Sequence, residues 1–117
     1  MTITYELSIW PERSFKAIDG MAGVYTNLHW KLTAASDDAV PLFASDEQRI
    51  ELPKPRADKF VAVAQMTPDA KAVKFVAWLD KYYGEGWLDK IKAGLVAQIE
   101  EQKIPPLVKE TAVVVEV

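Results

Sequence analysis

The chain has 117 residues, of which 50% are hydrophobic and 26% are charged, a balance typical of one folded domain rather than of a disordered segment. A net charge of -3 and the lack of an uninterrupted basic stretch argue against nucleic acid as a partner, and the absence of cysteine excludes disulfides and thiolate metal sites. The N-terminal MTITYELSIW lacks the pattern of a signal peptide, and no window approaches the roughly 20 apolar residues of a membrane helix, so we expect no membrane contact.

Alternation of apolar and polar residues predicts two β-strands near the N-terminus. Residues 3–9 alternate with the period of a half-buried strand, which Pro11 is expected to end. The dipeptide Asp19-Gly20 predicts a turn in the loop that follows. Residues 24–32 alternate most clearly, with Leu28 and Trp30 on one side. The opposite side of this second strand carries Tyr25, Asn27, His29 and Lys31.

The next stretch predicts further short strands. Residues 35–38 form a polar turn that is consistent with a hairpin to a strand at 40–45, and residues 49–53 read as another short strand. Residues 59–66, KFVAVAQM, have enough apolar and β-branched side chains to form a strand that leads into the second half.

Two amphipathic helices are predicted after residue 66. Thr67 is placed to cap the first helix and Pro68 to occupy its first position, while Gly84 and Gly86 end it. The second helix runs from about 87 to 103 and ends before Pro105-Pro106. The order predicts an α+β fold in which a helical pair packs on one face of a small antiparallel sheet. We expect one domain: residues 1–66 mainly β, 67–104 two helices, and 105–117 a C-terminal extension or edge strand.

The C-terminal ETAVVVEV is unusual, because chain ends are normally polar and frayed. Two interpretations stay open for it. It returns to its own sheet as an added edge strand, or it pairs with a neighbouring subunit and is then the functional element.

The sequence shows no catalytic constellation. His29 is the single histidine, and no nucleophile or orienting carboxylate is recognisable beside it, so a structural role is favoured over a catalytic one. The acidic pairs at 37–38, 46–47 and 100–101 have neither the spacing of a calcium loop nor a defined separation across a cleft. We therefore expect no enzymatic activity, no cofactor and no metal site.

The aromatic residues suggest where a protein partner could bind. Trp78 falls beside the main apolar stripe of the first helix, which indicates either burial on two sides or a partner surface, and Trp87 lies at the turn between the helices. The candidate interaction residues are Trp78, Trp87, Val113, Val114, Val115 and Val117.

Four segments in order carry a family resemblance: the strand TITYELSIW, the strand VYTNLHWKLTAAS with its HW pair, KFVAVAQMTPDAKAVKFVAWL running into a helix, and LVAQIEEQKIPP with its diproline. Over residues 2–106 the chain resembles a family of small uncharacterised tailed-bacteriophage proteins. The family pattern ends soon after the diproline, whereas this chain continues through LVKETAVVVEV.

The resemblance implies a location in the virion or the host cytoplasm. The leading hypothesis is a small virion-associated or assembly component that binds phage structural proteins or copies of itself. The alternative is a host-directed effector that binds and inhibits a host protein through its acidic surface. An enzyme that uses His29 and a carboxylate is the least favoured reading.

Overall fold

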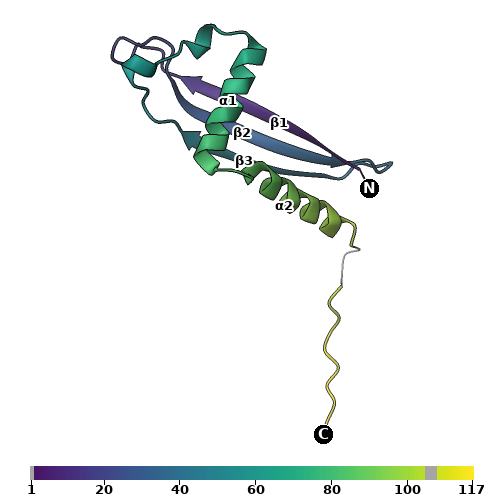
Figure 1. Cartoon of the computed structure of the whole chain (residues 1–117). Coiled ribbons are helices and arrows are strands. Elements are labelled where there is room, and N and C mark those ends of the chain that lie inside the picture. Colours follow the sequence, from purple (N-terminus) through teal and green to yellow (C-terminus); the bar gives the residue numbers. More distant parts are fainter. Residues whose placement is uncertain (1, 105–107) are drawn as a thin grey trace.

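A computed structural model describes residues 2–104 and 108–117 and shows a sheet of three antiparallel strands in the order β1-β2-β3 (Figure 1). The strands are β1 (Ile3–Arg13), β2 (Tyr25–Ser36) and β3 (Phe43–Glu51). Two short 3-10 turns, η1 (Ala57–Lys59) and η2 (Val63–Gln65), lead to the helices α1 (Pro68–Tyr83) and α2 (Trp87–Gln102). Both helices lie on the same face of the sheet, which confirms the expected α+β architecture.

The strand β1 continues through Pro11, which was expected to end it. β1 is an edge strand. The Asp37 amide donates a hydrogen bond to the Thr2 carbonyl, which shows that the backbone N–H and C=O groups of the even-numbered residues of β1 point toward β2. Backbone groups alternate in direction along a strand, so the nitrogen of Pro11 faces the unpaired side, where no N–H is needed. The prediction was wrong because it could not identify β1 as an edge.

The turn between β1 and β2 follows the prediction. Ile18 and Met21 exchange two backbone hydrogen bonds of 2.9 Å around Asp19-Gly20. Asp19 and Gly20 have φ values of 49° and 78°, the left-handed pair that a tight hairpin turn requires.

The second half of the sheet differs from expectation. The two short strands predicted at 40–45 and 49–53 are one strand, β3, whose polar residues interrupt the apolar pattern. The strand predicted at 59–66 is absent: this segment carries η2 and the end of η1. Its apolar character serves packing instead, because Val63 is 3% exposed and joins the core.

The core lies between β2 and the helices. Leu28, Trp30 and Leu32 on β2 are at most 1% exposed, and they pack in one cluster with residues of both helices. The helical members are Phe75 and Leu79 of α1 and Trp87, Leu95 and Ile99 of α2. Tyr25 was expected on the opposite side, but the register shifts between Glu12 and Arg13, and this bulge turns the Tyr25 ring into the core.

The helix boundaries agree with the sequence signals. The Thr67 hydroxyl accepts a 3.3 Å hydrogen bond from the Ala70 amide, and Pro68 is the first helical residue. Gly84, with φ of 92°, ends α1. A buried polar link then ties helix to sheet: the Trp30 Nε1–H donates to the Tyr83 hydroxyl over 2.9 Å. Burial raises the pKa of the Tyr83 hydroxyl, which also donates a 3.2 Å hydrogen bond to Gln48 Oε1.

Candidate functional site

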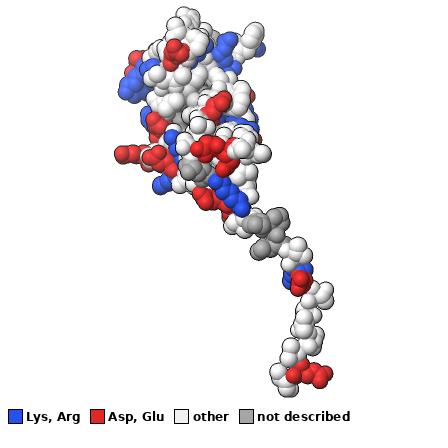
Figure 2. All heavy atoms as spheres, turned by 90° about the vertical axis from the view of Figure 1, so that its right-hand side faces the viewer, with Lys and Arg blue, Asp and Glu red and all other residues white. Residues whose placement is uncertain are grey.

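The C-terminal segment 108–117 extends away from the domain with every residue exposed (Figures 1 and 2). Val113, Val114 and Val115 are 88%, 88% and 74% exposed, and Val117 is also fully exposed. The segment forms no strand, so the interpretation in which it returns to its own sheet is not the arrangement in this structure.

The position where α2 ends gives a physical reason for this. Lys103 forms a 3.5 Å ion pair with Asp38 in the β2–β3 turn, at the end of the sheet where β1 and β3 both begin. A segment returning from there would run parallel to either edge strand. Parallel pairing is slightly less stable than antiparallel pairing.

The two free edges of the sheet differ in character. At β1 the odd-numbered residues direct their backbone groups outward, and the side chains of Ile3, Leu7 and Ile9 are only partly buried against the core. Tyr5, in the same row, is 37% exposed beneath Lys92 of α2, whose Nζ lies 4.8 Å from the ring centroid. The β1 edge therefore combines unpaired backbone with half-covered apolar side chains.

The β3 edge is better protected. Its outward residues include the charged Glu47, Arg49 and Glu51, which discourage strand pairing. The Gln102 side chain of α2 donates a 2.8 Å hydrogen bond to the Phe43 carbonyl and so occupies one acceptor of this edge. An incoming strand meets fewer obstacles along residues 3–9 of β1, because Pro11, which offers no N–H on this side, interrupts only the end of the edge.

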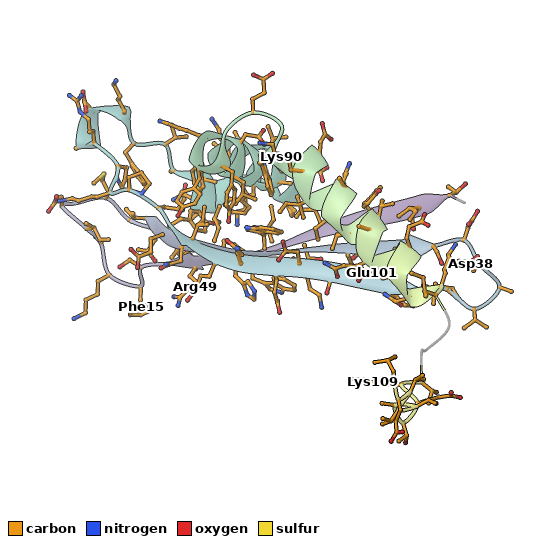
Figure 3. All side chains as sticks on the ribbon, turned by 90° about the horizontal axis from the view of Figure 1, so that it is seen from below. Phe15, Asp38, Arg49, Lys90, Glu101 and Lys109 are labelled. Carbon is orange, nitrogen blue, oxygen red and sulfur yellow. The ribbon has the colours of Figure 1, made fainter. Side chains whose placement is uncertain are left out.

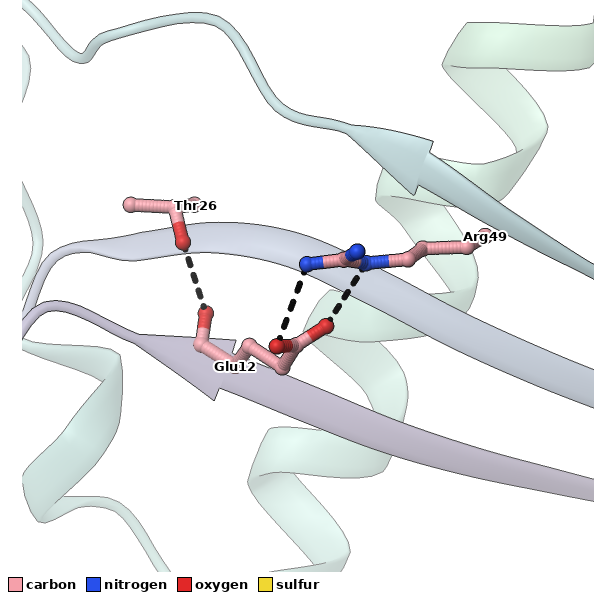
Figure 4. Close-up of polar contacts among 3 residues, drawn as sticks. All are labelled: Glu12, Thr26 and Arg49. Carbon is pink, nitrogen blue, oxygen red and sulfur yellow. Dashed lines mark hydrogen bonds and ion pairs between the residues drawn. The ribbon is translucent and has the colours of Figure 1, made fainter.

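The face of the sheet away from the helices carries polar clusters. Arg49 points to this side, opposite Lys90 on α2 (Figure 3). Its guanidinium holds Glu12 of β1 through two contacts, Nε–Oε1 at 2.8 Å and Nη2–Oε2 at 3.2 Å, and so spans β2 (Figure 4). Both side chains are at least half exposed, so the clamp contributes little stability.

His29 lies on the same open face. Its Nε2 is 3.1 Å from Glu47 Oε2, and its ring centroid is 5.2 Å from that of Trp10. The structure thus supplies the carboxylate partner that was not visible in the sequence, because Glu47 lies on the neighbouring strand. The side chains are 41% and 56% exposed, and no serine or threonine hydroxyl bonds to His29 in the described part of the chain. The pair lacks the nucleophile that triad chemistry requires.

The two tryptophan candidates occupy different environments. Trp87 is 7% exposed, packs against Trp30 and Tyr83, and donates its Nε1–H to Asp80 over 2.7 Å. It is a core residue rather than a surface for a partner. Trp78 is half-buried against Tyr25 and Phe75 and lines a pocket. The structure separates both tryptophans from the terminal valines.

The pocket that Trp78 lines has a volume of about 640 Å³, within the range of small-molecule sites. It lies between α1, the start of β2 and the segment that follows β3. Aromatic side chains form much of its wall: Tyr25, Phe60, Trp78 and Tyr82. Its basic lining residues are Lys54, Arg56, Lys59, Lys74 and Lys81, and none of the lining residues in the described part of the chain is acidic.

This basic cluster was missed at the sequence level. The KPRADK stretch holds only part of it, and there Asp58 divides the charges. Lys74 and Lys81 belong to α1, more than a dozen residues later. The seven-residue spacing of these two lysines puts them on one helical face with Trp78. This spacing was visible in the sequence, but the sequence did not show that residues 54–59 pack beside the same face.

Neither a metal centre nor a membrane-spanning helix is found in the described part of the chain. Across residues 2–104 and 108–117, no group of three histidine, aspartate or glutamate side chains could hold a metal ion. No helix within these ranges is both long and apolar enough to cross a membrane.

Comparison with known protein families gives a match over most of the chain. The family model for a domain of unknown function (DUF7936) covers residues 2–113. The match passes the diproline and reaches the first residue of the VVVEV run. No curated protein and no solved structure is significantly similar to the chain.

Proposed function

The chain belongs to the DUF7936 family, whose function is unknown, and we propose that it is a small non-enzymatic bacteriophage protein that acts through protein–protein contacts. In this proposal it is a virion-associated or assembly component and adds its C-terminal segment as a strand to another subunit. The bacteriophage origin rests on the resemblance of residues 2–106, and the mechanism rests on the exposed C-terminal valines.

The exposure of residues 113–117 is the observation that carries the mechanism. Several valines in a row at 74% exposure or more form an apolar, β-branched strip that is unfavourable in water. Strand addition would pair the backbone of this strip and cover alternate valines. Burying a valine side chain contributes about 1.5 to 3 kcal/mol, so a few of them offset much of the cost of association.

The β1 edge is the receptor that best fits such a strand. A segment from a second subunit can approach it antiparallel, which the chain's own segment cannot do. Its valines would then extend the row formed by Ile3, Leu7 and Ile9, whose side chains are only partly buried. Because donor and receptor lie on different parts of the chain, two subunits could exchange segments reciprocally in a closed dimer, whereas repeated head-to-tail addition would build a ring or a filament.

Deletion of residues 109–117 tests the mechanism. We expect the full chain to self-associate in sedimentation velocity and the truncated chain to be a monomer with the same melting temperature. Val115→Pro should mimic the deletion by removing one N–H, and Val108→Pro, a matched change outside the run, should not. A truncated chain that assembles like the full chain would contradict strand addition.

Cysteine cross-linking tests the receptor, because the natural chain has no cysteine. Mixing Val115→Cys with Tyr5→Cys protein should give a mixed disulfide, and mixing it with Glu47→Cys protein should give much less. Preferential cross-linking to position 47 would place the donor at β3 instead.

The biological setting has its own test. Detection of the protein by mass spectrometry in purified, washed particles is expected for a virion component, and reproducible absence would contradict that role. A pull-down from host lysate that yields one stoichiometric host protein would favour the host-directed effector instead.

A further inference from the structure

The pocket beside Trp78 concentrates positive charge in a protein whose overall charge is negative. Five basic side chains line it, and two of them have acidic partners at the rim: Lys54 pairs with Asp19, and Arg56 with Asp58 at 3.2 Å. Lys59, Lys74 and Lys81 form no ion pair within residues 2–104 and 108–117. Like charges gathered without counter-charges repel one another, and an anion would relieve that repulsion.

The wall between these charges is apolar and aromatic. Along α1, Lys74, Trp78, Lys81 and Tyr82 follow one another on one face, so the helix presents aromatic rings between ammonium groups. The Tyr82 side chain is 56% exposed at the pocket. A ligand that suits this wall needs a flat apolar body next to its negative charge.

The pocket is held in shape by close packing. The Trp78 ring centroid lies 5.6 Å from that of Phe75 and 5.9 Å from that of Tyr25, which restrains the indole. Gly23 also lines the pocket, and a Cβ at this position would lie 2.9 Å from the Ala64 Cβ. This close approach holds the β1–β2 loop against η2 at the wall of the pocket.

We propose that this pocket is a binding site for a nucleoside phosphate. The base stacks on the aromatic side chains of α1, and Lys59, Lys74 and Lys81 hold the phosphate. A volume of about 640 Å³ accommodates one nucleotide. The site is independent of the C-terminal segment and of strand addition.

Titration calorimetry with the full chain tests the proposal, using AMP, ATP, UMP, adenosine and inorganic phosphate as probes. We expect ATP and AMP to bind, adenosine and inorganic phosphate to bind at least about tenfold more weakly, and affinity to fall as salt rises. Lys74→Gln and Lys81→Gln should each weaken AMP binding about fivefold, the usual upper range for an exposed ion pair. Tyr82→Ala should weaken it about fivefold or more by removing a stacking surface.

Lys90→Gln is the matched control, because Lys90 lies on α2 outside the pocket (Figure 3). It should leave AMP affinity unchanged, and melting curves of all variants establish that they are folded. Absence of AMP and ATP binding would overturn the proposal, as would equal loss in Lys90→Gln and Lys81→Gln. Binding of inorganic phosphate as tight as that of AMP would overturn the aromatic contribution. Affinity for a single-stranded oligonucleotide that rises steeply with its length would replace the nucleotide with a nucleic-acid strand.

Discussion

Substitution of Gly23 by alanine should be unusually costly for a position that is not in the core. Gly23 has a φ of +70°, and the left-handed region costs a residue with a Cβ about 1 to 2 kcal/mol. The new Cβ would also lie 2.9 Å from the Ala64 Cβ, a contact that real Cβ atoms do not make. Relieving such an overlap by moving packed backbone costs about 1 to 3 kcal/mol more.

Gly20→Ala separates the two contributions. Gly20 has a φ of +78° but no heavy atom within 4 Å of a built Cβ, so its replacement carries the backbone cost alone. We expect about 1 to 2 kcal/mol for Gly20→Ala and about 2 to 5 kcal/mol for Gly23→Ala. The gain from a less flexible unfolded chain is the same for both and cancels in the difference.

Urea denaturation followed by tryptophan fluorescence measures both losses. Adding Ala64→Gly to Gly23→Ala should relieve the overlap between the two Cβ atoms and restore that part of the stability, but not the cost of the left-handed backbone. A double-mutant cycle isolates the contribution of the overlap. Equal losses for Gly20→Ala and Gly23→Ala would refute the close approach between the β1–β2 loop and η2. The contact between Gly23 and Ala64 at the wall of the pocket would then be refuted as well.

Tyr83→Phe should destabilise the fold by about 1 to 3 kcal/mol, because the Nε1–H of Trp30, 1% exposed, loses its acceptor; urea denaturation should show no comparable loss for Tyr82→Phe. Thr67→Ala should cost about 1 kcal/mol by removing the cap of α1, and an unchanged unfolding midpoint would show that the 3.3 Å bond is not formed in solution. A hydrogen bond from Ser36, and then the charge of Lys103, lowers the pKa of Asp38. The ionised Asp38 therefore stabilises the fold at pH values above the ordinary carboxyl pKa, and this stabilisation is lost as pH falls through the lowered pKa of the folded state. Carboxyl NMR titration should place the Asp38 midpoint below that of a free aspartate, and a midpoint at or above it would contradict the ion pair.

Local signals in the sequence determined the elements whose chemistry is local. The cap at Thr67, the glycines after Tyr83 and the Asp19-Gly20 turn each act within a few residues, so the helices and the first turn could be predicted closely. Alternation in β2 was visible because helices cover one of its faces and leave the other open.

Features that depend on neighbouring elements could not be predicted in this way. Pro11 is tolerated because β1 lies at the edge of the sheet, which only the strand order shows. Tyr25 lies in the core because of the bulge between β1 and β2. The apolar run at 59–66 has the composition of a strand, but it pairs with none of the three strands of the sheet, and Val63 joins the core from a 3-10 turn.

The candidate sites divide in the same way. The sequence alone marked the C-terminal valines, because an apolar β-branched run at a chain end is unusual. Their exposure is a result of the structure. It placed Trp87 beside Trp78 as an interaction residue, yet the interhelical turn buries Trp87 and leaves Trp78 in the pocket wall. The basic cluster and the His29–Glu47 pair exist only after folding, since each joins segments that are distant in the chain. Charge and hydrogen bonding act through space, so tertiary structure decided which of these side chains meet.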